Sequence, residues 1–183
     1  MSQYRRSNIK GGTYFFTVVT YRRRPVLCST AIRTALRNAI RSVRRDAPFH
    51  IDAWVLLPDH LHCIWTLPLG DSDYAKRWAM IKRVVTKQCK AVLHEEALLT
   101  QAKQRRNEGT LWQRRYWEHL IRDEADYARH VDYIHWNPVK HGLVDAVSDW
   151  PYSTFHRFVR QGLCPPDWGG GAAPKLDDKS FGE

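Results

Sequence analysis

The chain has 183 residues, 43% of them hydrophobic and 12% aromatic, which is enough for one compact domain with a packed core. It carries 29 Lys and Arg residues against 19 Asp and Glu residues, a formal net charge of +10. No apolar segment approaches the roughly 18 residues of a membrane span, and the N-terminus lacks the apolar stretch of a secretory signal. The four cysteines form no CxxC pair, which argues against a zinc ribbon or a disulfide framework and is typical of a reducing cytoplasm. We therefore expect a soluble cytoplasmic protein that does not bind membranes.

The positive charge is concentrated in three stretches. Residues 1–45 hold eleven basic residues and no acid, and two further basic stretches cover residues 75–90 and 103–115. Lys and Arg mixed with Tyr, Trp and Phe suit a partner that offers phosphates to pair with and bases to stack on. We therefore expect a nucleic acid partner. A solvated basic surface is the alternative, and a membrane surface is a weaker one because no hydrophobic anchor helix accompanies the charge.

The first half of the chain predicts two helices and three strands. Residues 11–21 are β-branched and aromatic and indicate a strand, whereas residues 29–46 repeat apolar side chains at helical spacing. Two more strands, over 49–58 and 60–68, meet at the turn signal Pro58-Asp59. A second helix is predicted over 71–93, and the polar residues 94–110 form a helix extension or a loop.

The second half predicts a short strand and then a helix. The strand covers residues 116–121, and the helix runs from 123 to Asn137-Pro138 or slightly beyond, because a proline disfavours α geometry at the residue before it. Residues 148–171 are irregular with a short helix, and the polar residues 169–183 are expected to fray.

The predicted order, β-α-β-β-α-β-α, defines an α+β fold. Its first six elements match the ferredoxin-like βαββαβ plan, an antiparallel sheet with helices on one face. A late helix and a C-terminal appendage follow. We divide the chain into a ferredoxin-like domain with a basic N-terminal arm, 1–145, and a partly irregular C-terminal extension, 146–183.

Four side chains form a candidate site. His60 and His62 share one face of a strand because alternate residues point the same way, and buried imidazoles need a partner for their nitrogens. Tyr133 and Asn137 share one face of the late helix because they are four residues apart. If that face covers the histidines, two imidazoles and an amide oxygen give a three-ligand site for Mg²⁺ or Mn²⁺, with zinc as an alternative.

Each of these residues also has an ordinary structural explanation. Histidine pairs of this spacing occur by chance, Tyr133 could be a packed aromatic residue, and an asparagine before a proline is often a turn residue. Only the combination, on a basic and aromatic-rich chain, favours catalysis.

Three separated segments resemble the REP-associated tyrosine transposases. They are LLPDHLHCIWTLP (56–68), YWEHLIRDEADYARHVDYIHWNPVKHGLV (116–144) and SDWPYSTFH (148–156), and the resemblance extends roughly over residues 3–90 and 111–168. These proteins are relatives of the single-tyrosine insertion-sequence transposases in the His-hydrophobic-His endonuclease superfamily. The segment 91–110 departs from the resemblance, because it is longer than the corresponding segment that a compact member of the family needs.

The resemblance implies a role for each residue of the candidate site. His60 and His62 match the His-hydrophobic-His metal pair, Tyr133 matches the nucleophile, and Asn137 matches the polar third ligand. It implies a DNA nicking and rejoining enzyme that acts on single-stranded DNA at a REP hairpin through a 5′-phosphotyrosine. The hairpin is a short palindrome cut beside a tetranucleotide at its foot.

Further residues are candidates for support and recognition. Glu118 and His119 could support the site from the neighbouring strand, with packed strand residues as the alternative. DNA contacts are expected from the following residues: Arg5, Arg6, Lys10, Arg22, Arg23, Arg24, Trp150 and His156. For the segment 150–168, packing on the core is an equal alternative.

Three other functions and the oligomeric state stay open. The chain could bind REP hairpins without cutting them, could use water as the nucleophile in a metal-dependent nuclease, or, less plausibly, could be an RNA-binding module. The insertion-sequence relatives work as dimers that exchange tyrosine helices. The tail of this chain could instead cap that surface and favour a monomer, so monomer and homodimer both stay open. In a cell we expect the protein in the cytoplasm, associated with the nucleoid.

Overall fold

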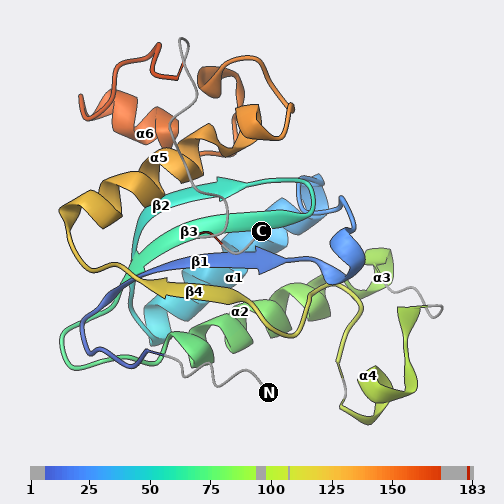
Figure 1. The fold of residues 1–183 in the computed structure, drawn as a ribbon. Coiled ribbons are helices and arrows are strands. Elements are labelled where there is room, and N and C mark those ends of the chain that lie inside the picture. The colour runs from blue at the N-terminus through green and yellow to red at the C-terminus, as the bar shows by residue number, and fades with distance from the viewer. Residues whose placement is uncertain (1–6, 94–97, 107, 170–180, 182–183) are drawn as a thin grey trace.

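A computed structural model describes residues 7–93, 98–106, 108–169 and 181. One antiparallel sheet of four strands has the order β2-β3-β1-β4 (Figure 1). The strands are β1 (Thr13–Val19), β2 (His50–Leu56), β3 (His60–Thr66) and β4 (Trp117–Leu120). This order is the one that the ferredoxin-like plan requires, so the predicted α+β fold is confirmed.

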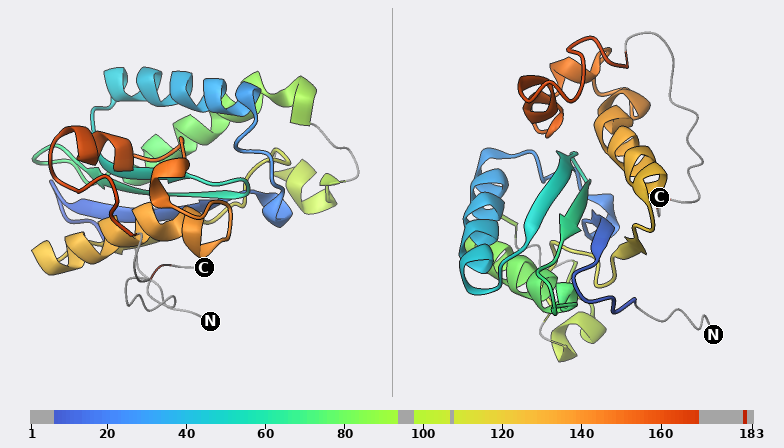
Figure 2. Two further views of the ribbon diagram at one scale, coloured as in Figure 1. Left: turned by 90° about the horizontal axis from the view of Figure 1, so that it is seen from above. Right: turned by 90° about the vertical axis from the view of Figure 1, so that its left-hand side faces the viewer.

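Two helices, α1 (Thr30–Asp46) and α2 (Tyr74–Gln88), cover one face of the sheet (Figure 2). The first buries the apolar side of its helical repeat, including Ile32 and Leu36, and leaves its arginines outside. The second begins where the side chain of Asp73 accepts a hydrogen bond from the backbone N–H of Lys76. Between helix and sheet, the rings of Trp65 and Trp78 stack with their centroids 4.2 Å apart.

The opposite face is covered by α5 (Glu124–Lys140), which makes the sheet the middle of three layers (Figure 2). The side chain of Asp123 caps the helix by accepting from the N–H of Asp126. Pro138 lies inside the last turn, and the helix continues past it to Lys140, in agreement with the predicted end at Asn137-Pro138 or slightly beyond. A proline at this position removes only one backbone hydrogen bond near the end of the helix, so the helix is little disturbed.

Short elements connect and extend these layers. They are η1 (Tyr21–Arg23), α3 (Lys90–Leu93), α4 (Gln101–Arg105), η3 (Val147–Asp149) and α6 (Phe155–Arg160). The segment before α6 lies along the β2 edge, where the N–H of Thr154 donates to the carbonyl of Trp54 at 2.8 Å. These contacts cross the division that we predicted at residue 145. Among the described residues, every helix is too short or too polar to cross a membrane.

Removing buried volume between α2 and the sheet should destabilise the protein. Ile81 is fully buried, so Ile81→Ala should lower the free energy of unfolding by about 2–5 kcal/mol. Leu69→Ala is the matched control, because Leu69 is 97% exposed, and its effect should stay within about 0.5 kcal/mol. Urea unfolding followed by Trp fluorescence measures both changes. Equal losses in the two variants would contradict this packing.

Candidate active site

The two histidines of β3 lie on the face of the sheet that α5 covers. His62 pairs in register with Thr17 of β1, and its ring centroid is 5.1 Å from that of Tyr133 on α5. The ring centroids of His60 and His62 are 4.9 Å apart. His60 is 1% exposed, and His62 and Tyr133 are fully buried. The structure therefore brings together the imidazole pair and the phenol that the sequence places about seventy positions apart.

Asn137 lies between the two contacts that α5 makes with this histidine pair. Tyr133, one turn before it, touches His62, and the ring of His141, one turn after it, lies 5.1 Å from the ring of His60. Residues at this spacing share one helix face, so Asn137 faces both histidines. It is fully buried, and neither polar atom of its side chain has a hydrogen-bond partner among the described residues. A buried amide without partners costs about 1–3 kcal/mol, which indicates a ligand at this position.

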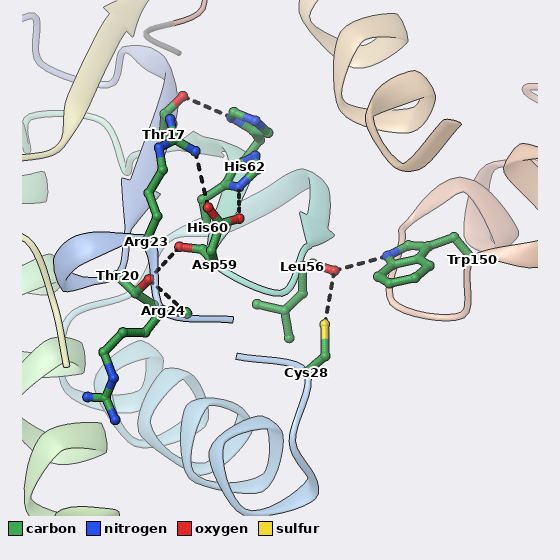
Figure 3. Close-up of polar contacts among 10 residues, drawn as sticks. All are labelled: Thr17, Thr20, Arg23, Arg24, Cys28, Leu56, Asp59, His60, His62 and Trp150. Atoms are coloured by element: carbon green, nitrogen blue, oxygen red, sulfur yellow. Dashed lines mark hydrogen bonds and ion pairs between the residues drawn. The ribbon is translucent and has the colours of Figure 1, made fainter. Parts of the chain in front are cut away.

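Hydrogen bonds fix the tautomer of each imidazole (Figure 3). The hydroxyl of Thr17 donates to the carbonyl of Phe181 at 2.7 Å, so Oγ1 of Thr17 accepts from Nδ1 of His62 at 2.9 Å. The carboxylate of Asp59 accepts from Nδ1 of His60 at 2.6 Å. Both rings therefore carry the proton on Nδ1 and the coordinating lone pair on Nε2, as metal-binding histidines do.

Asp59 orients His60, and sequence reasoning missed this role. Its carboxylate also pairs with Arg23, one of the arginines expected to contact DNA, at 3.2 Å (Figure 3). Burial alone would raise the pKa of Asp59, but the hydrogen bond from His60 and the charge of Arg23 outweigh burial and lower the pKa. The carboxylate is therefore ionised throughout the neutral range. Its place directly before the first histidine was the signal in the sequence.

The residues present fit a divalent cation. Nε2 of His60, Nε2 of His62 and the amide oxygen of Asn137 form a mixed nitrogen and oxygen set that suits Mn²⁺ or Mg²⁺. Of these atoms, the amide oxygen has no hydrogen-bond partner among the described residues. The burial of all three side chains keeps the surrounding dielectric low, so a cation there would act strongly on nearby charge.

A second group with metal-binding side chains, missed by the sequence analysis, joins β4 to α5. Possible ligand atoms of His119, Asp126 and His130 lie within 4.8 Å of one another. Most of these atoms are already hydrogen-bonded, because Nε2 of His119 bonds to the carboxylate of Asp126 at 2.8 Å and Nδ1 of His130 donates to the backbone carbonyl of Asp126 at 2.8 Å. Nε2 of His130 has no hydrogen-bond partner among the described residues. Burial lowers the pKa of His130 and favours its neutral form. We interpret the group as a brace that holds α5 on the sheet.

The two predicted supporting residues of β4 do not touch the histidine pair. His119 lies on the α5 face, but its partner is Asp126. Glu118 lies on the opposite face, buried beside Tyr74, whose hydroxyl donates to it at 3.4 Å. The prediction for Glu118 is wrong because neighbouring residues of a strand point to opposite faces, and only one of the two could face α5.

Lys140 supplies a positive charge beside the phenol. Its ammonium group donates to the hydroxyl oxygen of Tyr133 at 3.1 Å, and Nζ lies 4.8 Å from the centre of the ring. A cation at this position stabilises the phenolate relative to the phenol. The two residues are seven apart, which is two helical turns, so helical spacing in the sequence could have revealed the pair.

Phe181, near the C-terminus, covers the phenol. Its ring stacks on that of Tyr133, with centroids 3.7 Å apart and planes 7° from parallel, and it is 3% exposed. The prediction that residues 169–183 fray is therefore wrong at Phe181, and residues 170–180 and 182–183 lie outside the described residues. A single aromatic residue in a polar tail gave little signal, because its contacts are distant in sequence.

The other residues predicted to contact DNA have varied surroundings. Lys10 and Arg22 are exposed, Arg24 is half-buried, and Arg5 and Arg6 lie outside the described residues. Arg22 and Arg23 adopt positive φ angles of 57° and 50°, a left-handed backbone that costs about 1–3 kcal/mol per residue and often marks a functional segment.

Trp150 and His156 are attached to the sheet edge. The indole N–H of Trp150 donates to the carbonyl of Leu56 at 3.0 Å (Figure 3), and Nε2–H of His156 donates to the carbonyl of Trp150 at 2.9 Å. Packing on the core, the alternative that the sequence left open, describes these contacts better than stacking on bases.

Comparison with known proteins identifies the chain as a DNA-processing enzyme of the transposase class. Residues 8–137 match the family model described as "Transposase IS200 like". The REP-associated tyrosine transposase of Escherichia coli (strain K12) is 52% identical over 183 residues, which cover 100% of this chain and 98% of that protein. The chain thus belongs to the IS200-like transposases and, within them, to the REP-associated tyrosine transposases.

Two further comparisons agree with this family. A Haemophilus influenzae protein, assigned provisionally to the same group, is 44% identical over 176 residues, which cover 96% of this chain and 98% of that one. A solved structure described as a REP-associated tyrosine transposase bound to a REP hairpin is 50% identical, with a TM-score of 0.81, and the match covers 100% of this chain and 98% of that chain.

Removing the Phe181 ring should expose Tyr133. In Phe181→Ala, nitration of Tyr133 by tetranitromethane should rise several-fold, measured by mass spectrometry of the peptides. Tyr14 is the internal control, because it is equally buried on the α1/α2 face and should stay unreactive. Phe181→Leu, which keeps an apolar cover, should give an intermediate rate. An unchanged rate for Tyr133 in Phe181→Ala would contradict the contact.

Proposed function

We propose that this transposase cuts single-stranded DNA at a REP hairpin, with Tyr133 as the nucleophile. The observation that carries the proposal is the meeting of Tyr133, His60, His62 and Asn137 in one buried site. The solved relative bound to a REP hairpin supports the substrate, because the match covers the whole of this chain at 50% identity.

The residues of the chain support each part of a strand-transfer reaction. The phenol oxygen of Tyr133 would attack phosphorus in line, so that a tyrosyl P–O bond forms and the bond to the 3′ oxygen breaks. The products are a 5′-phosphotyrosine and a free 3′-OH. A phenol has a reference pKa near ~10, so about one in 10³ is ionised at pH 7, and the Lys140 ammonium at 3.1 Å favours that fraction. Because the ester keeps the energy of the broken bond, a 3′-OH can reverse the step and rejoin strands.

The histidine pair and Asn137 would hold the cation. His60 and His62 are locked with Nε2 as the coordinating atom, by Asp59 and Thr17 respectively. When bound, Mn²⁺ or Mg²⁺ would supply positive charge to a non-bridging oxygen and to the leaving oxygen. Asp59 raises the basicity of His60 and limits its rotation, and loss of such a partner typically costs 10–100-fold in metal affinity.

One observation favours a second function, binding without cutting. Phe181 covers the nucleophile, so DNA can reach Tyr133 only after the aromatic ring moves aside. A protein in the covered state would occupy REP hairpins and leave them intact. Because the catalytic residues are all present beneath the cover, we favour the enzyme that opens over the permanently inactive binder.

One chain would suffice for the reaction. The helix α5 packs on the sheet of its own chain, so Tyr133 meets its own His62 and no exchange with a partner is needed. We assign the chemistry to residues 1–145. In the extension, 146–183, the segment before α6 braces the β2 edge, and Phe181 covers the phenol. We place the protein in the cytoplasm at the nucleoid, because its substrate is chromosomal DNA.

Tyr133→Phe should abolish cleavage and the covalent adduct. The variant retains the ring that packs against Phe181 but lacks the nucleophilic oxygen, so hairpin binding should change by less than about threefold, within ~0.6 kcal/mol. A REP oligonucleotide labelled at both ends, incubated with Mn²⁺ and run on a denaturing gel, reports cut strands and adduct separately. Cutting by Tyr133→Phe near the native rate would refute the tyrosine role and indicate a nuclease that uses water.

Lys140→Met should slow cleavage because it removes the charge next to the phenol oxygen. We expect a loss of about tenfold or more in the single-turnover rate, the effect of ~1.4 kcal/mol of lost stabilisation. Lys140→Arg, which keeps the charge, should retain most of the activity. If the Met and Arg variants lose activity equally, the role of Lys140 is steric and the electrostatic account fails.

A further inference from the structure

A basic groove lies on the α2 side of the sheet, away from Tyr133. It has a volume of about 790 Å³ and is lined by α2, by α4 and by the segment from Glu108 to Arg114. Six of its lining residues are basic and one, Glu108, is acidic. The basic residues are Lys82, Arg83, Lys87, Lys90, Lys103 and Arg114. Such a concentration of one sign of charge in a recess attracts an anion.

Two buried donors distinguish the groove from an ordinary basic surface. Lys103 is 7% exposed, and its ammonium group has the carbonyl of Gly109 at 3.0 Å and the ring of Tyr21 at 4.0 Å as its contacts. Within the described part of the chain, no carboxylate pairs with it. Trp112 is also 7% exposed, and its indole N–H has no hydrogen-bond partner there. A buried ammonium group without a carboxylate is costly, so Lys103 indicates an anionic ligand with acceptor oxygens. The indole N–H of Trp112 can donate to the same ligand, although the indole N–H groups of Trp65 and Trp78 in the core also lack partners.

The groove is connected to the active site through η1. The segment that forms its wall runs beside the end of β1, where the N–H of Gln113 donates to the carbonyl of Val19 at 2.9 Å. Arg24 of the η1 turn donates to the carbonyl of Thr110 at 3.4 Å, and the neighbouring Arg23 pairs with Asp59 at 3.2 Å. Two consecutive arginines, Arg23 and Arg24, therefore link the carboxylate that orients His60 to the wall of the groove.

We propose that this groove binds the phosphate backbone of single-stranded DNA flanking the hairpin, on the far side of η1 from the cut. The proposal rests on the proposed function and extends it to a second contact with the same strand. A flexible single strand can turn its phosphates inward to reach Lys103 and Trp112. The phosphates of a rigid duplex lie on a convex surface and would meet only the exposed rim.

The groove is tested with the double variant Arg83→Gln/Lys87→Gln, which removes two exposed lining cations. The matched control is Arg37→Gln/Arg41→Gln, which removes the same charge from exposed positions of the neighbouring α1. Fluorescence anisotropy measures the affinity of each protein for a REP hairpin with single-stranded flanks and for the same hairpin without them, over a range of salt concentrations.

The groove variant should lose at least about tenfold in affinity for the flanked hairpin, with the salt slope reduced by about 1.4 for two lost phosphate contacts. It should bind the hairpin without flanks as the unmodified protein does. An equal loss of affinity for both DNAs would mean that the groove binds the duplex stem. An equal loss of affinity in the control variant would mean that binding depends on the net charge of the protein and not on the groove. Either result, or no loss at all, overturns the proposal.

The variant Lys103→Met tests the role of the groove independently. It removes a buried charge that has no carboxylate partner, so thermal stability should be kept or raised while affinity for flanked DNA falls. A loss of thermal stability with unchanged affinity for flanked DNA would show that Lys103 has a structural role. It would refute the proposal that Lys103 binds DNA phosphates. The adduct assay separates this proposal from the proposed function, because groove variants at saturating DNA should still form the Tyr133 adduct. If the unmodified protein forms none, the proposed function fails, whatever the binding data show.

Discussion

The packing of α5 on the sheet face that carries His60 and His62 is the constraint on which the site depends. It places Tyr133 against one histidine and His141 against the other, and so fixes Asn137 opposite both. The brace formed by His119, Asp126 and His130 ties the beginning of the same helix to β4, which limits how far the helix can slide. Because alternate residues of β3 face α5, a slip of one residue in that strand would replace both imidazoles by Leu61 and Cys63.

Charge around the site is arranged to prepare it for an anion. Asp59 and Thr17 set the tautomers of the histidines, and Lys140 lies at the phenol oxygen. Arg23 and Arg24 link Asp59 to the wall of the groove beside α2. Phe181 opposes the entry of an anion, because its apolar ring covers Tyr133. Its backbone carbonyl accepts a hydrogen bond from the hydroxyl of Thr17. The same hydroxyl that orients His62 is therefore linked to the cover, and movement of the cover would change the hydrogen bonds of a proposed metal ligand.

Periodicity in the sequence predicted the elements of the fold and grouped the central residues in pairs. Alternation put His60 and His62 on one face and helical spacing put Tyr133 and Asn137 on another, but only the structure brings the two faces together. Asp59 and Lys140 carried a local signal, because one precedes the histidine pair and the other lies two helical turns after the tyrosine. Phe181 carried little, since its contact with Tyr133 joins residues that are distant in sequence. Glu118 was misassigned because the sequence shows that strand residues alternate but not which of two neighbours faces α5.

The most direct test of the account is to locate Mn²⁺ in crystals of the protein by anomalous diffraction, in the native chain and in Asn137→Ala. The account predicts one strong peak within coordination distance, about 2.0–2.4 Å, of Nε2 of His60, Nε2 of His62 and Oδ1 of Asn137, weakened or lost in the variant. A peak at His119, Asp126 and His130 alone, or none beside the His60 and His62 pair at saturating Mn²⁺, would contradict it.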